Sequence, residues 1–254
     1  MSLLDVREAS KNFGSLAAVR GVSLSVRAGE LRAVIGPNGA GKTTFFNLIT
    51  GAFRPTSGSI HLDGRDITAV AAWRRVTLGM ARTFQITEIF PELTLAENLR
   101  ISFEVASGLR LRPWISRATA AKLHRDVEEM LDLAGLAAKA GRLVGELSHG
   151  DQRAAEIAMA LALRPRLLLL DEPTAGMGEQ ETYDVAQLIR RLHRDRNLTI
   201  VLIEHDMRVV FHLADRIAVL DQGSLIADGT PAEIAANAAV QAAYLGKPND
   251  AGAA

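Results

Sequence analysis

The feature that most constrains this chain is a glycine-rich octet at residues 36–43, GPNGAGKT. It matches the pattern G-x-x-x-x-G-K-[ST] of a phosphate-binding loop. A short apolar run, Leu31 to Ile35, precedes it, and Thr44 to Ile49 favour a helix after it. Glycines let backbone N–H groups turn inward around a polyphosphate, and a helix N-terminus adds positive partial charge. The octet therefore predicts a strand, a loop and a helix that bind a nucleoside triphosphate.

The residues of this phosphate loop have distinct expected roles. Lys42 is expected to reach the β- and γ-phosphates, and the Thr43 hydroxyl is expected to bind Mg²⁺. A glycine-rich turn that binds nothing is the alternative, but the strand and helix around the octet favour a binding loop. The predicted nucleotide contacts here are Gly36, Asn38, Gly39, Ala40, Gly41, Lys42, Thr43 and Thr44.

A second motif lies downstream, where the apolar run Leu167–Leu170 ends in Asp171 and Glu172. Ligands of open α/β folds bind at the carboxyl ends of parallel strands. Asp171 is expected to hold Mg²⁺ or its coordinated water. Glu172, beyond the strand end, is expected to accept a proton from the attacking water. A solvated turn is the alternative, and the upstream phosphate loop makes the catalytic interpretation the favoured one.

Composition narrows the class of protein. The 254 residues include 29 basic and 29 acidic ones, so the chain lacks the net positive charge of a nucleic-acid-binding protein. No apolar run is long enough to span a bilayer, and residues 1–7 lack the apolar core of a secretory signal. The chain has no cysteine, which removes disulfides and thiolate metal sites. We expect a soluble, intracellular protein.

The order of the expected elements indicates an α/β fold. Short buried strands alternate with amphipathic helices after residue 167, which favours a parallel sheet covered on both faces. Residues from about 86 to 144 are mostly helical in pattern and form a candidate insertion. The expected strands are 3–6, 19–26, 31–35, 59–62, 167–170, 199–203, 217–220 and 225–227.

The segment 147–153, LSHGDQR, leads into a helical run and lies shortly before the second motif. It is similar to the signature L-S-G-G-Q-Q-R of the ATPases of ATP-binding cassette (ABC) transporters. His149 and Asp151 depart from that pattern. A carboxylate at a helix N-terminus suits the helix dipole, so we expect the Asp151 change to be tolerated.

This resemblance covers nearly the whole chain and implies a fold. We expect one domain over residues 1–246, a P-loop NTPase (ABC ATPase) core with a mixed or parallel sheet. An antiparallel β subdomain at the N-terminus and an inserted α-helical subdomain at about 86–163 would complete it. Residues 247–254 are expected to form a disordered tail.

The resemblance also assigns roles to further residues. Phe13 matches the aromatic residue that stacks on adenine, and Gln85 matches a Mg²⁺ ligand that senses the permease. His205 matches the histidine that contacts the γ-phosphate. Ser148 and Gly150 match donors that cap the ATP bound to the other subunit of a pair. Taken alone, the residues leave a core phenylalanine, a surface amide and a structural histidine open as alternatives.

One position in the loop after Glu172 departs from the family. Gly178 stands where the family usually has aspartate in the segment that crosses the dimer interface. The role left in doubt is communication between the two nucleotide sites.

The implied function is ATP hydrolysis that powers an importer, with ATP and Mg²⁺ as cofactors. The implied partners are two membrane permeases, a second ATPase subunit and, indirectly, a solute-binding protein, with no nucleic acid. The chain would lie at the cytoplasmic face of the inner membrane. Residues 79–85, 93–99, 204–207 and 244–246 resemble the larger ATPase of the branched-chain (hydrophobic) amino acid importers.

Three alternatives remain. The sequences LSHG at 147–150 and AGM at 175–177 also occur in relatives that import urea, short amides or aromatic acids. A soluble cassette ATPase acting on DNA or ribosomes would show coiled coils, zinc cysteines, two cassettes or a basic face. A phosphate-loop kinase or GTPase would lack the segment 147–153.

Overall fold

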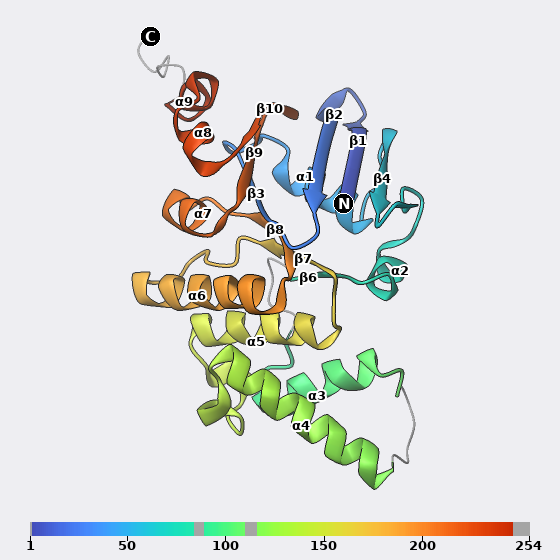
Figure 1. The fold of residues 1–254 in the computed structure, drawn as a ribbon, viewed down its shortest axis with the longest axis vertical. Coiled ribbons are helices and arrows are strands. Elements are labelled where there is room, and N and C mark those ends of the chain that lie inside the picture. The colour runs from blue at the N-terminus through green and yellow to red at the C-terminus, as the bar shows by residue number, and fades with distance from the viewer. Residues whose placement is uncertain (1, 84–88, 110–115, 246–254) are drawn as a thin grey trace.

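The computed structural model describes residues 2–83, 89–109 and 116–245 (Figure 1). The first third of the chain is mostly strands: β1 (Ser2–Phe13), β2 (Leu16–Arg27), β3 (Leu31–Ile35), α1 (Lys42–Thr50), β4 (Ser57–Leu62), β5 (Arg65–Asp66), α2 (Ala72–Thr77) and β6 (Met80–Arg82). Helices come next: α3 (Leu95–Ala106), α4 (Arg117–Ala134), the 3₁₀ turns η1 (Ala137–Lys139) and η2 (Val144–Glu146), and α5 (His149–Ala162). The last part alternates: β7 (Leu167–Asp171), α6 (Glu179–Arg196), β8 (Thr199–Ile203), α7 (Met207–Leu213), β9 (Arg216–Asp221), β10 (Ser224–Gly229), α8 (Pro231–Ala235) and α9 (Ala238–Leu245).

The strands of the described residues form two sheets. The smaller has the order β2-β1-β4-β5 and is antiparallel. The larger has the order β10-β9-β3-β8-β7-β6. Its strands β9 to β6 are parallel, and β10 joins the edge in the antiparallel sense. The larger sheet is therefore mixed, and the predicted α/β fold class with an N-terminal antiparallel sheet is confirmed.

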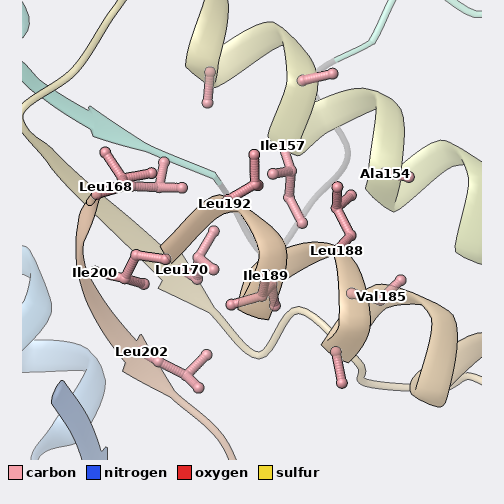
Figure 2. Packing of buried hydrophobic residues seen from close by; sticks show 14 of the residues in the cluster. Ala154, Ile157, Leu168, Leu170, Val185, Leu188, Ile189, Leu192, Ile200 and Leu202 are labelled. Carbon is pink, nitrogen blue, oxygen red and sulfur yellow. The ribbon is translucent and has the colours of Figure 1, made fainter. Parts of the chain in front are cut away.

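The central strands β3, β7 and β8 are buried at every position because both faces of the larger sheet are covered. Successive side chains of a strand point to opposite faces. One set meets α6, with α5 packed behind that helix (Figure 2). The other set meets α1 and the smaller sheet. The residues facing α6 are Leu168, Leu170, Ile200 and Leu202, and those on the opposite face are Leu167, Leu169, Val201 and Ile203.

Helices α3 and α4 pack on α5 and on each other at the end of the molecule away from the smaller sheet (Figure 1). Their starts are fixed by side chains that satisfy free backbone N–H groups. Thr94 caps α3 and forms a reciprocal capping box with Glu97. Ser116 caps α4, and Gly135 ends it in the left-handed conformation.

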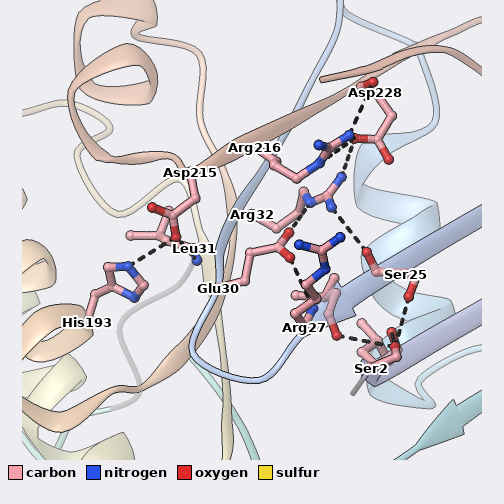
Figure 3. A network of polar contacts seen from close by, with 12 residues as sticks. Ser2, Ser25, Arg27, Glu30, Leu31, Arg32, His193, Asp215, Arg216 and Asp228 are labelled. Atoms are coloured by element: carbon pink, nitrogen blue, oxygen red, sulfur yellow. Dashed lines mark hydrogen bonds and ion pairs between the residues drawn. The ribbon is translucent and has the colours of Figure 1, made fainter. Parts of the chain in front are cut away.

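A buried polar network links the start of β3 to β10 in the larger sheet and to β2 in the smaller sheet (Figure 3). The Arg32 side chain is only 3% exposed, and its Nε donates to Glu30 at 2.6 Å. Its other nitrogens donate to Asp228 of β10 and to the carbonyl of Ser25 in β2. Arg216 shares the Asp228 carboxylate. The network fixes the start of β3, whose far end enters the phosphate loop.

Within the described ranges, every helix is too short or too polar to cross a membrane. The predicted disordered tail, residues 247–254, lies outside the described residues, and so does Gln85.

Candidate nucleotide-binding site

The phosphate loop connects β3 to α1 and depends on two of its glycines. Gly36 has φ 152° and Gly41 has φ 95°, a region that favours glycine. A Cβ at Gly36 would lie 2.1 Å from the carbonyl oxygen of Leu220, and one at Gly41 would lie 2.4 Å from that of Ala18. The loop thus passes so close to β9 and β2 that side chains at these positions would collide with backbone.

Lys42 begins α1 and is buried beneath the loop, with 6% of the residue exposed. Its ammonium donates to the carbonyl oxygens of Gly36 at 2.7 Å and Pro37 at 2.9 Å. Burial lowers the pKa of Lys42, and the negative charge of Glu172 opposes that shift. The cation of the first motif and the carboxylate of the second therefore lie within electrostatic reach of each other.

A cavity of about 530 Å³ lies over the phosphate loop. Glu172 and His205 line it, although they come from the ends of β7 and β8. Strand β2 contributes Leu16, Ala18 and Arg20 to the wall. The loop residues that line it are Asn38, Gly39, Ala40, Gly41, Lys42, Thr43 and Thr44.

Glu172 and His205 are in direct contact. The Nε2 atom of His205 lies 2.9 Å from Oε1 of Glu172. Glu172 has φ 47°, a left-handed conformation that costs a non-glycine residue about 1 kcal/mol or more. This turn takes its side chain out of the strand direction and into the cavity. The strain falls at the residue whose carboxylate is expected to act as general base.

Glu204 contacts the segment after Glu172 and the segment that begins with His205. The sequence did not single it out. It is 3% exposed, and one carboxylate oxygen accepts from the Thr174 N–H at 2.9 Å. The other oxygen accepts from the His205 N–H at 2.8 Å. The sequence feature that could have indicated this residue is a carboxylate directly after an apolar strand. Glu204 holds the loop after Glu172 and the start of the His205 segment together.

Asp171 ends β7 and pairs with a residue that the sequence did not single out. Its Oδ2 accepts from Nη2 of Arg82 at 2.7 Å, and Nη1 of Arg82 donates to Asn47 in α1 at 2.7 Å. Asp171 and the Thr43 hydroxyl in the first turn of α1 supply oxygen ligands, which suit a hard cation such as Mg²⁺. The residues present therefore fit the predicted metal.

Phe13 lies at the end of β1, and 44% of it is exposed. Its ring meets the edge of Phe53 at 5.4 Å between centroids, and the Lys11 ammonium lies 5.2 Å from its centroid. Leu16 of β2, the register partner of Phe13 across the hairpin, lines the cavity, whereas Phe13 is not among the described residues that line it. Phe13 thus stands at the tip of the hairpin beside the cavity, with a face accessible to a ligand.

The signature segment, residues 147–153, lies apart from this cavity. Ser148 caps α5 by accepting from the Asp151 N–H, and Gly150 is in the first turn. Both line a second cavity of about 550 Å³ between α5 and α6. Of the described residues lining the phosphate-loop cavity, none belongs to the signature segment. One chain therefore does not bring its own signature to its own phosphate loop.

Arg153 links α5, which begins within the signature segment, to the residues that follow β7. Its guanidinium donates to the carbonyl oxygens of Glu172 at 2.9 Å and Pro173 at 3.2 Å. It also pairs with Glu156 on the same helix. These hydrogen bonds join α5 to the backbone at Glu172, a connection that the motif alone did not predict.

The structure describes the surroundings of two departures from the family pattern, Asp151 and Gly178. Asp151 pairs with Lys139, which offsets its negative charge at the signature. Gly178 has φ −69°, and a Cβ there would meet nothing within 4 Å. The fold therefore does not require glycine at position 178.

The C-terminal helix also reaches the phosphate loop. Burial raises the pKa of Tyr244 in α9 to about 12, and the nearby backbone N–H of Gly36 opposes this shift. The Tyr244 hydroxyl therefore lies near the first residue of the loop.

A family model described as ABC transporter matches residues 19–175, from β2 to the loop after Glu172. This chain belongs to the ABC transporter family. The match includes the phosphate loop, the signature segment and the Asp171–Glu172 pair. Membership confirms the predicted ABC ATPase fold and makes the chain an ATP-binding ATPase subunit of a transporter.

Further similarities place the chain within that family. A model described as branched-chain amino acid ATP-binding cassette transporter matches residues 224–248. The high-affinity branched-chain amino acid transport ATP-binding protein BraF of Pseudomonas aeruginosa is 41% identical over 96% of this chain and 98% of its own length.

Two solved ABC structures are similar to this one. A cassette in its ADP conformation has a TM-score of 0.84 and 30% identity, covering 97% of this chain and all of the other. A dimeric cassette in a post-hydrolysis state, bound to ADP and Pi, has a TM-score of 0.75 and 25% identity, covering 90% of this chain and 98% of the other.

Proposed function

We propose that this ABC ATPase powers an importer of branched-chain or other hydrophobic amino acids. The likeness to BraF over 96% of the chain supports this cargo, as does the C-terminal model matching residues 224–248. The ATPase site itself has no contact with the cargo, so the choice among cargoes rests on this likeness. Import of urea, short amides or aromatic acids would use the same site.

The observation that carries the proposed mechanism is the 2.9 Å contact between Glu172 and His205 beside the phosphate loop. Lys42 would leave its loop carbonyls and offset the charge of the β- and γ-phosphates. Glu172 would accept a proton from the attacking water, and His205 would hold that carboxylate and donate to the γ-phosphate. Phe13 would stack on the adenine at the hairpin tip.

Mg²⁺ would be held by Thr43, Asp171 and Gln85, of which Gln85 lies outside the described residues. When bound, it would supply positive charge that offsets the charge of the ATP phosphates. The Arg82 guanidinium keeps the Asp171 carboxylate oriented at the strand end, 2.7 Å away.

A second ATPase subunit would complete each site. Ser148 and Gly150 lie at a different cavity from the phosphate loop of their own chain. Donors in that position would cap an ATP bound to a partner, so that two ATP molecules lie between two subunits. The dimeric cassette bound to ADP and Pi shows that a relative pairs in this family.

The remaining proposed partners are two permeases and, through them, a solute-binding protein, with this chain at the cytoplasmic face of the inner membrane. An apolar cavity of about 380 Å³ lies beside β6, between α2 and α5. Trp73 and Val76 line it and are 66% and 42% exposed. Arg82 and Thr83, which also line the cavity, precede Gln85 in the sequence, and this supports the cavity as the contact site of a permease segment.

The test replaces the native chain with Glu172→Gln in cells and measures uptake of labelled leucine and labelled urea. We expect leucine uptake to be lost while urea uptake continues, and ATP hydrolysis by the purified complex to fall by about 10²–10⁴-fold. The control is Glu179→Gln, since the Glu179 side chain is 89% exposed.

Loss of urea uptake alone would move the cargo to the urea branch. Loss of neither would overturn the amino acid proposal. Unchanged hydrolysis by the Glu172→Gln complex would remove Glu172 from its catalytic role.

A further inference from the structure

The hydrogen-bond donors of the signature segment are already engaged by a carboxylate of the same chain. Glu181, in the first turn of α6, accepts from the Gly150 N–H with its Oε1 at 3.2 Å. The Ser148 hydroxyl and the Gly178 N–H lie close to the same carboxylate and lower its pKa. Ser148 and Gly150 are the donors proposed above to hold the γ-phosphate of a partner's ATP. An internal anion and that phosphate therefore need the same hydrogen bonds.

The packing around Gly150 shows that this contact is close. A Cβ at Gly150 would lie 3.0 Å from Cβ and 3.1 Å from Cγ of Glu181. Real Cβ atoms rarely make contacts this short, so the Glu181 side chain lies in the space that a side chain at position 150 would need. The glycine thus admits the carboxylate directly to the start of α5.

The electrostatics favour an anion at this position. The start of the 14-residue helix α5 carries positive partial charge, which stabilises carboxylates and phosphates alike. The hydrogen bonds from Gly150 and Ser148 lower the pKa of Glu181, so its carboxylate is ionised at neutral pH. His149 adds a weaker effect in the same direction. The nearby Asp151 carboxylate is paired with Lys139 and does not take these donors.

We propose that Glu181 is an internal competitor for the γ-phosphate, which occupies the signature in the separated subunit and must be displaced when two subunits close on ATP. The proposal rests on the pairing of two ATPase subunits proposed above. On closure, the γ-phosphate replaces the Glu181 carboxylate at the donors of Ser148 and Gly150. Because the carboxylate must be displaced, Glu181 raises the ATP concentration at which closure occurs.

The position of Glu181 in the chain gives this exchange a second effect. Glu181 follows the loop that runs from Glu172 to Gly178, and Thr174 in that loop is held by Glu204. Displacing Glu181 therefore releases the start of α6 from α5 at the same time as the γ-phosphate arrives. The competitor couples occupancy of the signature to the loop that carries the general base.

The experiment compares Glu181→Gln, Glu181→Asp and Asp184→Asn in the purified transporter complex. Glutamine removes the charge, and aspartate keeps the charge but is too short to reach Gly150. Asp184 is the control, because it lines the same cavity one turn along α6 and its hydrogen bond is to Gln180. The readouts are the ATP concentration for half-maximal hydrolysis, kcat, and ATP affinity of the isolated chain by calorimetry.

We expect both Glu181 variants to lower the half-maximal ATP concentration by at least threefold, with the ATP affinity of the isolated chain unchanged. Asp184→Asn should match the unmodified protein. A half-maximal concentration that is unchanged or raised in both Glu181 variants would overturn the proposal. If Glu181→Gln does not fold, the Glu181→Asp protein decides the question in the same assay.

Failure of this inference is distinguishable from failure of the proposed function. If Glu172→Gln abolishes leucine uptake but the Glu181 variants behave like Asp184→Asn, only the competitor is refuted. If Glu172→Gln leaves uptake intact, the proposed import function fails, while the half-maximal ATP concentration still reports on Glu181.

Discussion

Lys42 combines burial with charge at a single residue. Its ammonium is held by two loop carbonyls, and its pKa is lowered because burial disfavours the cation. The carbonyls keep the charge in place, while the desolvation makes it a stronger partner for phosphate. Burying the Lys42 charge costs folding free energy, and a bound polyphosphate would offset that cost by pairing with the ammonium.

Replacement of this residue gives the first prediction. Lys42→Ala should weaken ATP binding by at least tenfold, since a charge-assisted contact contributes about 1.5–3 kcal/mol. The thermal unfolding midpoint should not fall much, because a desolvated charge is removed along with its contacts. Isothermal calorimetry on the isolated chain measures the affinity, with the exposed Lys122→Ala as control. Normal ATP binding by Lys42→Ala would contradict a phosphate-binding loop.

The sequence motifs specified much of the site at this scale. The octet and the Asp171–Glu172 pair are local patterns, and the structure gathers Lys42, Glu172 and His205 at one cavity. Arg82 and Glu204 were not predicted. Their partners, Asp171 and Thr174, come from other segments of the chain, and a buried ion pair or hydrogen bond between distant segments has no sequence spacing.

At the scale of elements, one arginine adds donors to a helix end that a glycine already caps. Gly51 follows α1 in the left-handed conformation, and its N–H donates to the carbonyl of Leu48. Helix α1 ends at Thr50, and its last carbonyls need donors. Arg75 of α2 supplies them, donating to the carbonyl oxygens of Leu48 and Ile49. It also donates to carbonyls of the 67–70 loop. Only 1% of Arg75 is exposed, and burial lowers its pKa to about 10, so it remains charged at neutral pH.

Arg75→Ala should therefore lower the free energy of unfolding by more than about 3 kcal/mol, because several buried carbonyls lose their donor. Urea denaturation measures the change. The neighbouring Arg74, whose side chain lies over the Trp73 ring, provides the control, and Arg74→Ala should change stability by less than about 0.5 kcal/mol. Equal effects from the two variants would show that Arg75 does not cap α1.

The expected elements differ from the observed ones according to their burial. The strand 199–203 matches β8, and 167–170 falls one residue short of β7, because both strands are buried throughout and nearly all apolar. The N-terminal strands were predicted too short, as 3–6 and 19–26 instead of Ser2–Phe13 and Leu16–Arg27. These strands carry polar residues and several register shifts, so their apolar alternation is interrupted. The very short β5 and β6 have too few residues to show a period.

At the scale of the whole molecule, the site is divided between two places. The phosphate loop and Glu172 lie at one cavity and Ser148 at another, so the proposed pairing of subunits would bring them to one site. The sequence resemblance implied this pairing, and no local pattern could have measured the separation. The order of strands that creates it depends on the full chain.

Ser148→Ala should impair ATP hydrolysis by the assembled complex by at least tenfold and leave ATP binding by the isolated chain unchanged. Loss of the α5 cap would itself cost about 1 kcal/mol of stability. Thr94→Ala is the matched control, because it removes a cap of the same kind from α3. Similar losses of hydrolysis and of isolated-chain binding would mean that Ser148 acts within its own subunit.

The neighbours of β3 have a consequence for biosynthesis. Leu31 pairs with Ile200 of β8, and Arg32 pairs with Arg216 of β9, although β3 leaves the ribosome first. During translation the strand that carries the phosphate loop has both edges unpaired until β8 (Thr199–Ile203) and then β9 (Arg216–Asp221) have been synthesised. Such unpaired strand edges expose the nascent chain to aggregation. We therefore expect the nascent chain to form its phosphate-binding loop only late in its synthesis.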